Sequence, residues 1–227
     1  MKPGLLAGLA LLVMAGGLGC KRRLWYEWRD EPYLRKVYRG GERKALARMR
    51  SFWHDDREIG ARALAVIARE ARAAGDEETA RRLARQLMDH YRREDNYETR
   101  GIIVALCLRE AGEGDSEVCG FLKSRLNSGE HPVAAAYSLA TLRPTGAFEA
   151  ISAAYEKTRD HEIRYELLGA LWLLGDARAI PLLERALAEI DAGWPSRVHH
   201  MKKPLYRKAL AGRLETLRAA CAAGVVP

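Results

Sequence analysis

Beyond its N-terminal segment, the chain places apolar residues every three or four positions, which is the spacing of one face of an α-helix. Short stretches rich in Gly, Asp or Pro separate these apolar stripes, as turns between helices do. No segment shows an obvious strand pattern. The pattern therefore predicts an all-α protein in which consecutive helices are joined by short turns.

The clearest unit is the segment DHEIRYELLGALWLLGDARAIPLLERAL at 160–187. Asp160 is placed to cap a first helix, Gly175 to end it, and Asp176 to cap a second helix. The apolar stripe of the first helix comprises Ile163, Leu167, Leu168, Leu171 and Leu174. The apolar stripe of the second comprises Ala179, Ile180, Leu183, Ala186, Leu187 and Ile190. The spacing predicts two helices that each bury one face.

This unit resembles a HEAT-like repeat, of the kind also found in phycobilin lyases. The residues that carry the resemblance are Asp160, Ile163, Arg164, Leu168, Gly169, Ala170, Leu171, Leu174, Gly175, Asp176, Ala179 and Leu183. Earlier segments repeat the order of helix, turn and helix, and residues 137–151 align with 166–180 at an offset of 29. Pro144 stands where the clearest unit has Leu173, which predicts a shorter first helix there.

The repeats predict about four helix pairs over residues 55–192. The resemblance implies a right-handed α-solenoid, in which neighbouring pairs stack to bury a continuous core. Capping helices are expected at 31–54 and 193–227. The stripe of the first cap comprises Ala45, Leu46, Met49, Phe52 and Trp53, and that of the second comprises Leu210, Leu214, Leu217 and Cys221. Tetratricopeptide repeats are the architectural alternative, which the segment at 78–91 favours.

Residues 1–19 have the pattern of an export signal: one basic residue, an apolar core and a run of small residues before Cys20. The segment resembles the signal peptide of bacterial lipoproteins. The resemblance implies cleavage before Cys20, a diacylglycerol on its sulfur and a third acyl chain on its amino group. It also implies that Lys21 directs the protein to the outer membrane. The expected location is the periplasmic face of that membrane, with residues 20–30 as a lipidated basic stem.

Two other interpretations of the N-terminus stay open. Gly17 and Gly19 also form a small-x-small site for ordinary secretory cleavage. The basic residues at 21–23 outnumber those before the apolar core, which would favour an uncleaved anchor with the body in the cytoplasm. Against that anchor, residues 5–19 extend about 22 Å as a helix at ~1.5 Å per residue, less than the ~30 Å hydrocarbon core.

The formal charge of +8 is concentrated at the N-terminus. Residues 1–50 contain 12 Lys and Arg against 4 acidic residues, whereas the two signs balance over residues 51–227. A basic stretch at 197–218 leaves the middle of the chain acidic. A body that is neutral overall lacks the long basic stripe that nucleic-acid binding requires, so we expect no nucleic-acid partner.

The residues that follow Cys20 combine positive charge with aromatic rings. If Cys20 is acylated, then Lys21, Arg22 and Arg23 would meet anionic headgroups. Trp25 would occupy the headgroup zone, which favours amphipathic rings. The alternative is that these aromatic residues pack on the first helices of the domain.

Sequence signatures of catalysis are absent: there is no phosphate-binding glycine loop, no HExxH, no CxxC and no GxSxG. His199 and His200 are adjacent and are therefore not placed to ligate one metal together. His54 fits a helix start, and His131 and His161 fit capping or turn positions at corresponding repeat entrances. We therefore expect no enzymatic activity, no cofactor, no metal and no small-molecule substrate.

Cys107 and Cys119 lie six residues on either side of Glu113, at the middle of a predicted turn. An antiparallel helix pair would place them opposite each other, and an oxidising envelope would allow a disulfide. The alternative is that both are small core residues.

The sequence thus predicts a lipid-anchored, non-catalytic scaffold that binds an unknown envelope protein or peptide. The membrane is the second expected partner, through the acyl chains on Cys20. The alternative function, by analogy with phycobilin lyases, is an enzyme-associated chaperone or lyase-like protein.

Overall fold

A computed structural model describes residues 38–193 and 202–224, and within them every regular element is helical. The α-helices are α3 (Gly41–Met49), α4 (His54–Ala73), α5 (Glu77–Arg93), α6 (Tyr97–Ile102), α7 (Leu108–Ala111), α8 (Ser116–Ser128), α9 (Pro132–Leu142), α10 (Ala147–Lys157), α11 (His161–Leu174), α12 (Ile180–Asp191) and α13 (Lys202–Ala222). A π-helix, η1 (Ile103–Cys107), joins α6 to α7, and a 3₁₀ turn, η2 (Ala177–Ala179), leads into α12. The predicted all-α fold class is confirmed.

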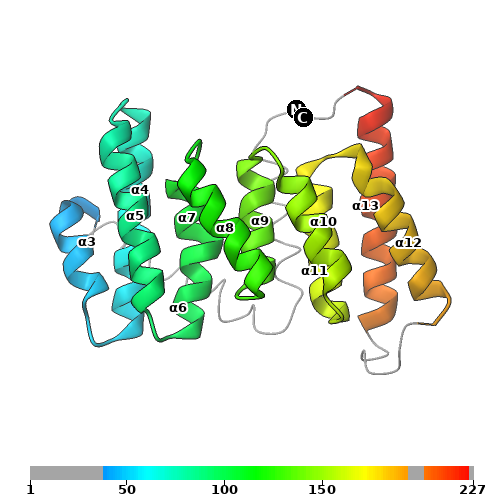
Figure 1. Cartoon of the computed structure of the whole chain (residues 1–227), viewed down its shortest axis with the longest axis horizontal. Helices are drawn as coiled ribbons and strands as arrows, with labels where there is room; N and C mark the ends of the chain where they lie inside the picture. The colour runs from blue at the N-terminus through cyan, green and yellow to red at the C-terminus, as the bar shows by residue number, and fades with distance from the viewer. Residues whose placement is uncertain (1–37, 194–201, 225–227) are drawn as a thin grey trace.

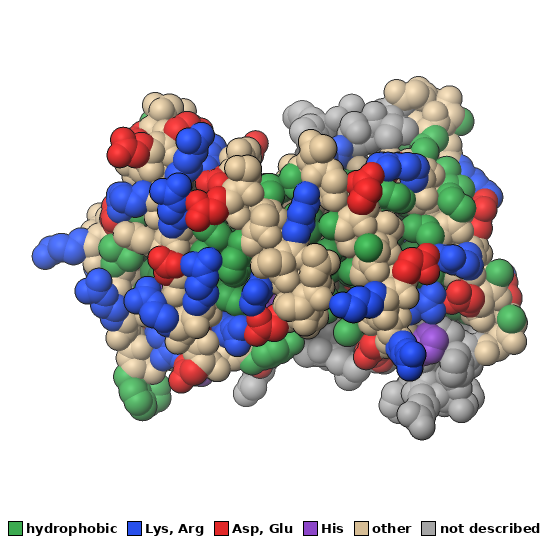
Figure 2. All heavy atoms as spheres, viewed as in Figure 1, with side chains coloured by type: hydrophobic (Ala, Val, Ile, Leu, Met, Phe, Trp, Pro, Cys, Tyr) green, Lys and Arg blue, Asp and Glu red, His purple; other side chains and the backbone are tan. Residues whose placement is uncertain are grey.

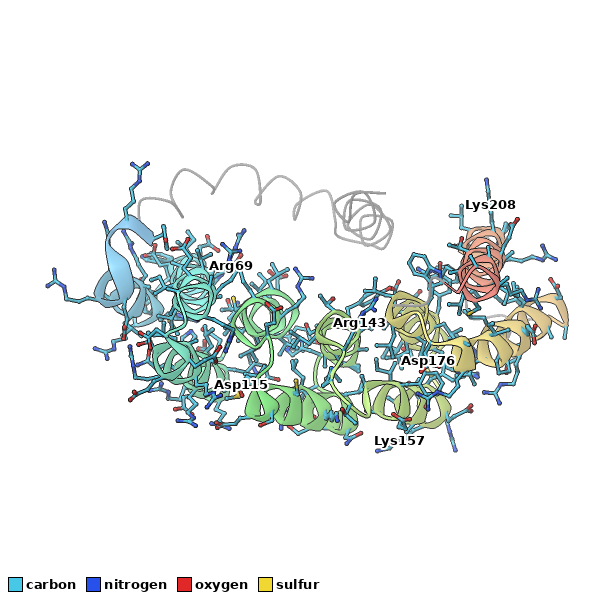
Figure 3. The ribbon with its side chains drawn as sticks, turned by 90° about the horizontal axis from the view of Figure 1, so that it is seen from above. Arg69, Asp115, Arg143, Lys157, Asp176 and Lys208 are labelled. Atoms are coloured by element: carbon cyan, nitrogen blue, oxygen red, sulfur yellow. The ribbon has the colours of Figure 1, made fainter. Side chains whose placement is uncertain are left out.

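The helices follow one another along the chain as antiparallel pairs: α4 and α5, the continuous α6–η1–α7 helix and α8, α9 and α10, and α11 and α12. Figure 1 shows these pairs side by side along the longest axis, from α3 at one end to α12 and α13 at the other. The first helices of the pairs contact one another in sequence order, and so do α5, α8 and α10. Figure 3 shows the resulting two layers and the curvature of the row, with α3 and α13 displaced toward the same side.

Aspartate side chains cap helices at four turns, because each accepts hydrogen bonds from backbone N–H groups that the first helical turn leaves unpaired. Asp160 accepts from the Glu162 N–H at 2.8 Å, and Asp176 accepts from the Arg178 N–H at 2.9 Å. Asp76 and Asp115 cap α5 and α8 in the same way. The predicted caps at Asp160 and Asp176 are confirmed, as is the helix stop at Gly175, whose φ is +78°.

Positions that the sequence alignment pairs at an offset of 29 are neighbours in space. The Tyr137 hydroxyl donates to Glu166 Oε2 at 3.1 Å, and Arg178 pairs with Glu149 at 2.6 Å. Arg185 pairs with Glu156 at the same offset. Equivalent helices therefore lie parallel in adjacent pairs and contact each other at equivalent positions.

Two details distinguish the first helices of the pairs. The helix α9 ends at Leu142, ahead of Pro144, and is shorter than α11, as that proline predicts. In η1, the hydroxyl of Ser138 on α9 donates to the Val104 carbonyl at 2.7 Å. A π-helix leaves the normal hydrogen-bond ladder, and this side chain satisfies a carbonyl that has been turned away from it.

A continuous apolar core runs from Ala45 on α3 to Leu217 on α13. At its N-terminal end, a Cβ on Gly60 would lie 2.7 Å from the Ala45 carbonyl oxygen. Only glycine therefore allows the α3 and α4 backbones to pack this closely. At the other end Leu210, Leu214 and Leu217 are buried and Cys221 packs against them, which confirms the C-terminal apolar stripe.

The predicted N-terminal apolar stripe is wrong at two positions. Ala45 and Met49 are buried, but α3 ends at Met49, and Phe52 and Trp53 lie in the turn before α4. Their exposed fractions are 86% and 67%. The stripe is interrupted because Arg57 donates hydrogen bonds to the carbonyls of Ser51 and Phe52, which holds this turn outside the helix.

Candidate functional site

A solvent-open groove of about 380 Å³ lies between α10 and α12, the second helices of two adjacent pairs. Its volume falls within the range of ligand pockets, ~300–1,000 Å³. Its lining residues are Phe148, Glu149, Ser152, Ala153, Glu156, Arg178 and Leu182. The groove thus combines two large apolar side chains with charged walls and a floor of small residues.

Arg178 forms one wall of the groove. Its guanidinium bonds to Asp176 and to Glu149, each at 2.6 Å, and lies over the Phe148 ring at 4.2 Å. These side-chain hydrogen bonds lower the pKa of Asp176 and of Glu149. Both carboxylates therefore stay ionised at neutral pH, and the wall is a fixed set of charges beside an aromatic face.

Two turns further along α10, Glu156 also lines the groove and pairs with Arg185 on α12. On the floor, the Ser152 hydroxyl donates to the Glu149 carbonyl at 3.2 Å, so it is already engaged within its helix. The lining offers hydrogen-bonding and apolar surface but no activated nucleophile. The arrangement is suited to non-covalent binding of an extended or helical segment.

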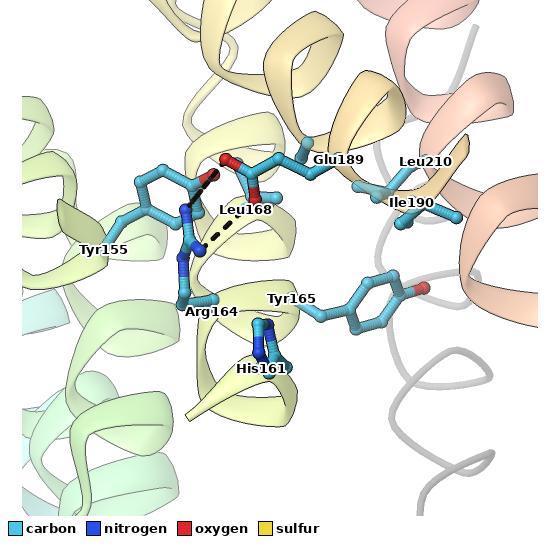
Figure 4. A pocket seen from close by; sticks show the side chains of 9 residues that line it. Tyr155, His161, Arg164, Tyr165, Leu168, Glu189, Ile190 and Leu210 are labelled. Atoms are coloured by element: carbon cyan, nitrogen blue, oxygen red, sulfur yellow. Dashed lines mark hydrogen bonds and ion pairs between the residues drawn. The ribbon is translucent and has the colours of Figure 1, made fainter. Parts of the chain in front are cut away.

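A second cavity, between α10, α11 and α12, is much smaller, about 10 Å³, which is room for about one water molecule. Figure 4 shows Arg164 between Tyr155 and Glu189. Arg164 donates to the Tyr155 hydroxyl at 3.0 Å, pairs with Glu189 at 3.3 Å and lies over the Tyr155 ring at 4.6 Å.

The same arrangement occurs two pairs earlier in the chain. Arg100 pairs with Glu130 and lies over the Tyr91 ring at 4.6 Å. The arginine and the tyrosine recur at equivalent helix positions, whereas Glu130 lies in the turn after α8 and Glu189 lies within α12. In both copies the arginine joins successive pairs, and the cavity beside Arg164 is too small for a ligand larger than water.

A buried polar cluster fastens α13 to α9 and α11. Arg213 on α13 lies over the Tyr165 ring at 4.9 Å, and it faces the carboxyl of Glu166 and the hydroxyl of Tyr137. Burial raises the pKa of Glu166 and that of Tyr137. A Cβ on Gly169 would collide with the Tyr137 hydroxyl. Gly169, a glycine in the middle of a helix, was the one sequence signal for this cluster.

The turn before α4 is fixed by Arg57, whose guanidinium uses all of its nitrogens. It forms a bidentate pair with the buried carboxylate of Glu94, at 2.6 and 2.8 Å, in addition to its bonds to the turn carbonyls. Burial alone would raise the pKa of Glu94, but the bonds from Arg57 and from the Asn96 N–H outweigh it and lower the value to about 2. Phe52 and Trp53 are therefore held in place, with their rings edge to face at 5.4 Å.

The residues predicted to attach the protein to the membrane lie outside the described part of the chain. They are Cys20, Lys21, Arg22, Arg23 and Trp25. His199 and His200 also lie outside it. Lipidation and membrane contact at these positions stay predictions.

Cys107 and Cys119 are both free thiols and both buried. Cys107 belongs to the core cluster, as the alternative interpretation of this pair expects. Burial raises the pKa of each thiol, which keeps it protonated and unreactive. A disulfide between them under oxidising conditions stays a prediction.

His54, His131 and His161 occupy turn and helix-start positions. His131 precedes α9 in a left-handed conformation, with φ of +50°, and lies against the Tyr97 ring at 4.1 Å. His161 begins α11, and His54 Nδ1 lies 3.0 Å from Asp55. Among the described residues, no group of three or more His, Cys, Asp or Glu is arranged to hold a metal ion.

Comparisons with known protein families, curated proteins and solved structures found no match to this chain. None of the helices in the described ranges is both long and apolar enough to cross a membrane.

Proposed function

We propose that this chain is a membrane-anchored lipoprotein of the bacterial cell envelope that acts as a non-catalytic scaffold for protein interaction. Its body would be a right-handed α-solenoid of four HEAT-like helix pairs with capping helices at both ends. The observation that carries the proposal is the open groove between α10 and α12, which has binding volume and fixed charges but no activated nucleophile.

The repeated contacts support the proposed architecture. Equivalent positions of adjacent pairs meet at an offset of 29 residues, and arrays built in this way present extended surfaces for partners. Figure 2 shows the face formed by the second helices, on which basic and acidic side chains alternate over most of the surface. On a surface with interspersed charges of both signs, a partner is selected by how its own charges align with them more than by its net charge.

The groove favours a peptide segment with an apolar side chain as its ligand. Phe148 and Leu182 would contact that side chain, while Glu149 and Arg178 are positioned to orient the polar backbone around it. The proposed partner is an envelope protein that presents such a segment to the periplasmic face of the outer membrane.

A matched pair of substitutions tests the groove. Ala153→Trp would fill it, whereas Ala188→Trp places the same side chain at an exposed position of α12 that does not line it. Cross-linking in cells followed by purification should recover an envelope protein with the wild type and with Ala188→Trp, but not with Ala153→Trp. Equal recovery with both variants would remove the groove from the proposal.

The lipid anchor is tested separately by the mass of the mature N-terminal peptide. A triacylated peptide that begins at Cys20 is the expected result. An intact N-terminus, or an unmodified Cys20, contradicts the lipoprotein assignment.

A further inference from the structure

The segment 39–50, which contains α3, carries exposed arginines that have no carboxylate partner within the described residues. Arg43 lies on α3, Arg39 precedes the turn at Gly40 and Gly41 that begins this helix, and Arg50 follows its last residue. Several other arginines are paired across helices, as Arg82 is with Glu42 at 2.5 Å. An arginine that forms no ion pair within the protein can pair with an anion on a binding partner.

The exposed aromatic pair, Phe52 and Trp53, follows this basic segment directly in the chain. Large apolar side chains as exposed as Phe52 and Trp53 are uncommon on a folded domain unless a partner covers them. In Figure 2 hydrophobic side chains project at the lower left, at the end of the molecule that α3 occupies in Figure 1, with basic side chains beside them. We call Arg39, Arg43, Arg50, Phe52 and Trp53 the α3 surface.

The projection is rigid as well as exposed. The turn that carries it is held by Arg57, and the Ser51 hydroxyl donates to Asp56 at 3.0 Å while Arg48 pairs with Asp56 at 2.8 Å. A turn held by this many bonds does not fold back to bury its rings.

We propose that the α3 surface rests on an anionic lipid bilayer, with Phe52 and Trp53 in the headgroup zone and the arginines on anionic headgroups. A projecting aromatic pair needs a complementary pocket on a protein, but it enters a deformable headgroup layer directly. Each arginine near such a surface contributes favourably to binding. The surface would orient the scaffold, with α3 toward the membrane and α13 away from it.

The proposal rests on the proposed membrane anchor only for the nearness of a bilayer. Seventeen residues separate Cys20 from the first described residue, and a chain of that length spans at most ~60 Å. An acyl group on Cys20 would therefore keep the α3 surface within reach of the membrane.

The test uses the full chain with Cys20→Ala, so that no acyl chain contributes to binding. Co-sedimentation is measured with vesicles of phosphatidylcholine, with and without phosphatidylglycerol. Arg39→Gln with Arg43→Gln should weaken binding to the anionic vesicles roughly thirtyfold, since each charge near the surface contributes about a fivefold factor. Phe52→Ser with Trp53→Ser should weaken binding to both kinds of vesicle, and serine at position 53 preserves the N-cap of α4.

Two control variants remove the same chemistry from elsewhere. Lys157→Gln with Arg159→Gln removes two exposed charges from the end of α10, and Leu205→Ser removes an exposed apolar side chain from α13. Both should bind as the parent chain does. The thermal unfolding midpoint of every variant is measured alongside, because all the changed side chains are exposed and the fold should persist.

The proposal is overturned if the α3-surface variants bind the vesicles as tightly as the parent does. It is also overturned if the control variants lose as much vesicle binding as the α3-surface variants. Residues 1–19 are present in all variants. If they bind the vesicles by themselves, the α3-surface variants will bind as tightly as the parent. Loss of a cross-linked protein without loss of vesicle binding would instead assign the α3 surface to a protein partner. The anchor is decided by the mass of the N-terminal peptide, so either proposal can fail alone.

Discussion

The two ends of the helix row use arginine in different ways. Between α10 and α12, Arg178 and Arg185 each pair with a carboxylate one repeat away. At the α3 end, Arg39 and Arg43 have no such partner among the described residues. The difference shows that a formal charge of +8 does not describe an evenly basic protein, because the charges of a close ion pair largely cancel.

The buried polar groups differ between the same two ends. At the N-terminal end, the Arg57–Glu94 pair fixes an exposed turn that projects from the fold. At the C-terminal end, Arg213, Glu166 and Tyr137 are enclosed between three helices. The N-terminal pair holds an exposed turn in place, whereas the C-terminal cluster packs within the fold.

The largest effect is expected from Glu94→Gln at the N-terminal end. The change leaves the Arg57 guanidinium without its buried anionic partner, and breaking such a pair costs about 3 kcal/mol in free energy of unfolding. Urea denaturation measures the loss. The control is Glu149→Gln, which breaks an exposed pair of similar geometry and should cost under about 1 kcal/mol. Equal losses in free energy of unfolding would show that the ion pairs at the two ends stabilise the fold equally.

The acid sensitivity of the N-terminal end follows from the same carboxylate. The pKa of Glu94 is about 2 in the folded protein and about 4.3 in an unfolded chain. Its contribution to stability is therefore complete above pH ~5 and is lost as the pH falls toward 2.

The stability difference between wild type and Glu94→Gln should accordingly shrink between pH ~5 and pH ~2, as followed by urea denaturation at each pH. His90, whose Nε2 lies 3.2 Å from Glu94 Oε2, lowers the stability of both chains at acid pH. Burial lowers the pKa of His90, so the unfolded chain binds a proton below pH ~6.5 before the folded protein does. A difference that does not change with pH would contradict the assignment to Glu94.

A pair of glycine substitutions tests the enclosed C-terminal cluster. Gly169→Ala should destabilise the protein by about 1–3 kcal/mol, because the added methyl group collides with the Tyr137 hydroxyl and approaches Arg213. Gly120→Ala on α8 meets no atom within 4 Å and should stabilise by up to about 1 kcal/mol, since alanine is the better helix former. Thermal or urea unfolding measures the change in stability of both variants. A stability change of the same sign in both would contradict the close packing at Gly169.

The sequence predicted features that depend on local chemistry. The caps at Asp160 and Asp176 and the early end of α9 before Pro144 each depend on one residue and its own turn. The apolar stripes of the pairs were readable for the same reason, because a helix fixes which residues share a face.

Features that depend on contacts between distant segments were not predicted. Phe52 and Trp53 continue an apolar stripe in sequence, and only the bonds from Arg57, itself fixed by Glu94 on the following helix, take them out of it. The π-helix η1 accepts a hydrogen bond from Ser138, more than 30 residues away, and the groove wall includes the pair of Arg178 with Glu149 one repeat earlier. No local pattern carries such information.

The smallest effect is expected from the ion pairs that border the groove. Arg178 and Glu149 are both more than half exposed, so a double-mutant cycle with Arg178→Gln and Glu149→Gln should give a coupling free energy of about 0.2–1 kcal/mol that falls with added salt. A coupling this weak means that a partner can replace the pair's contacts at little cost, as a binding wall requires. A coupling well above 1 kcal/mol that persists in high salt would instead identify the pair as a structural clamp between α10 and the turn before α12, and would leave the groove without a wall that adapts to a ligand.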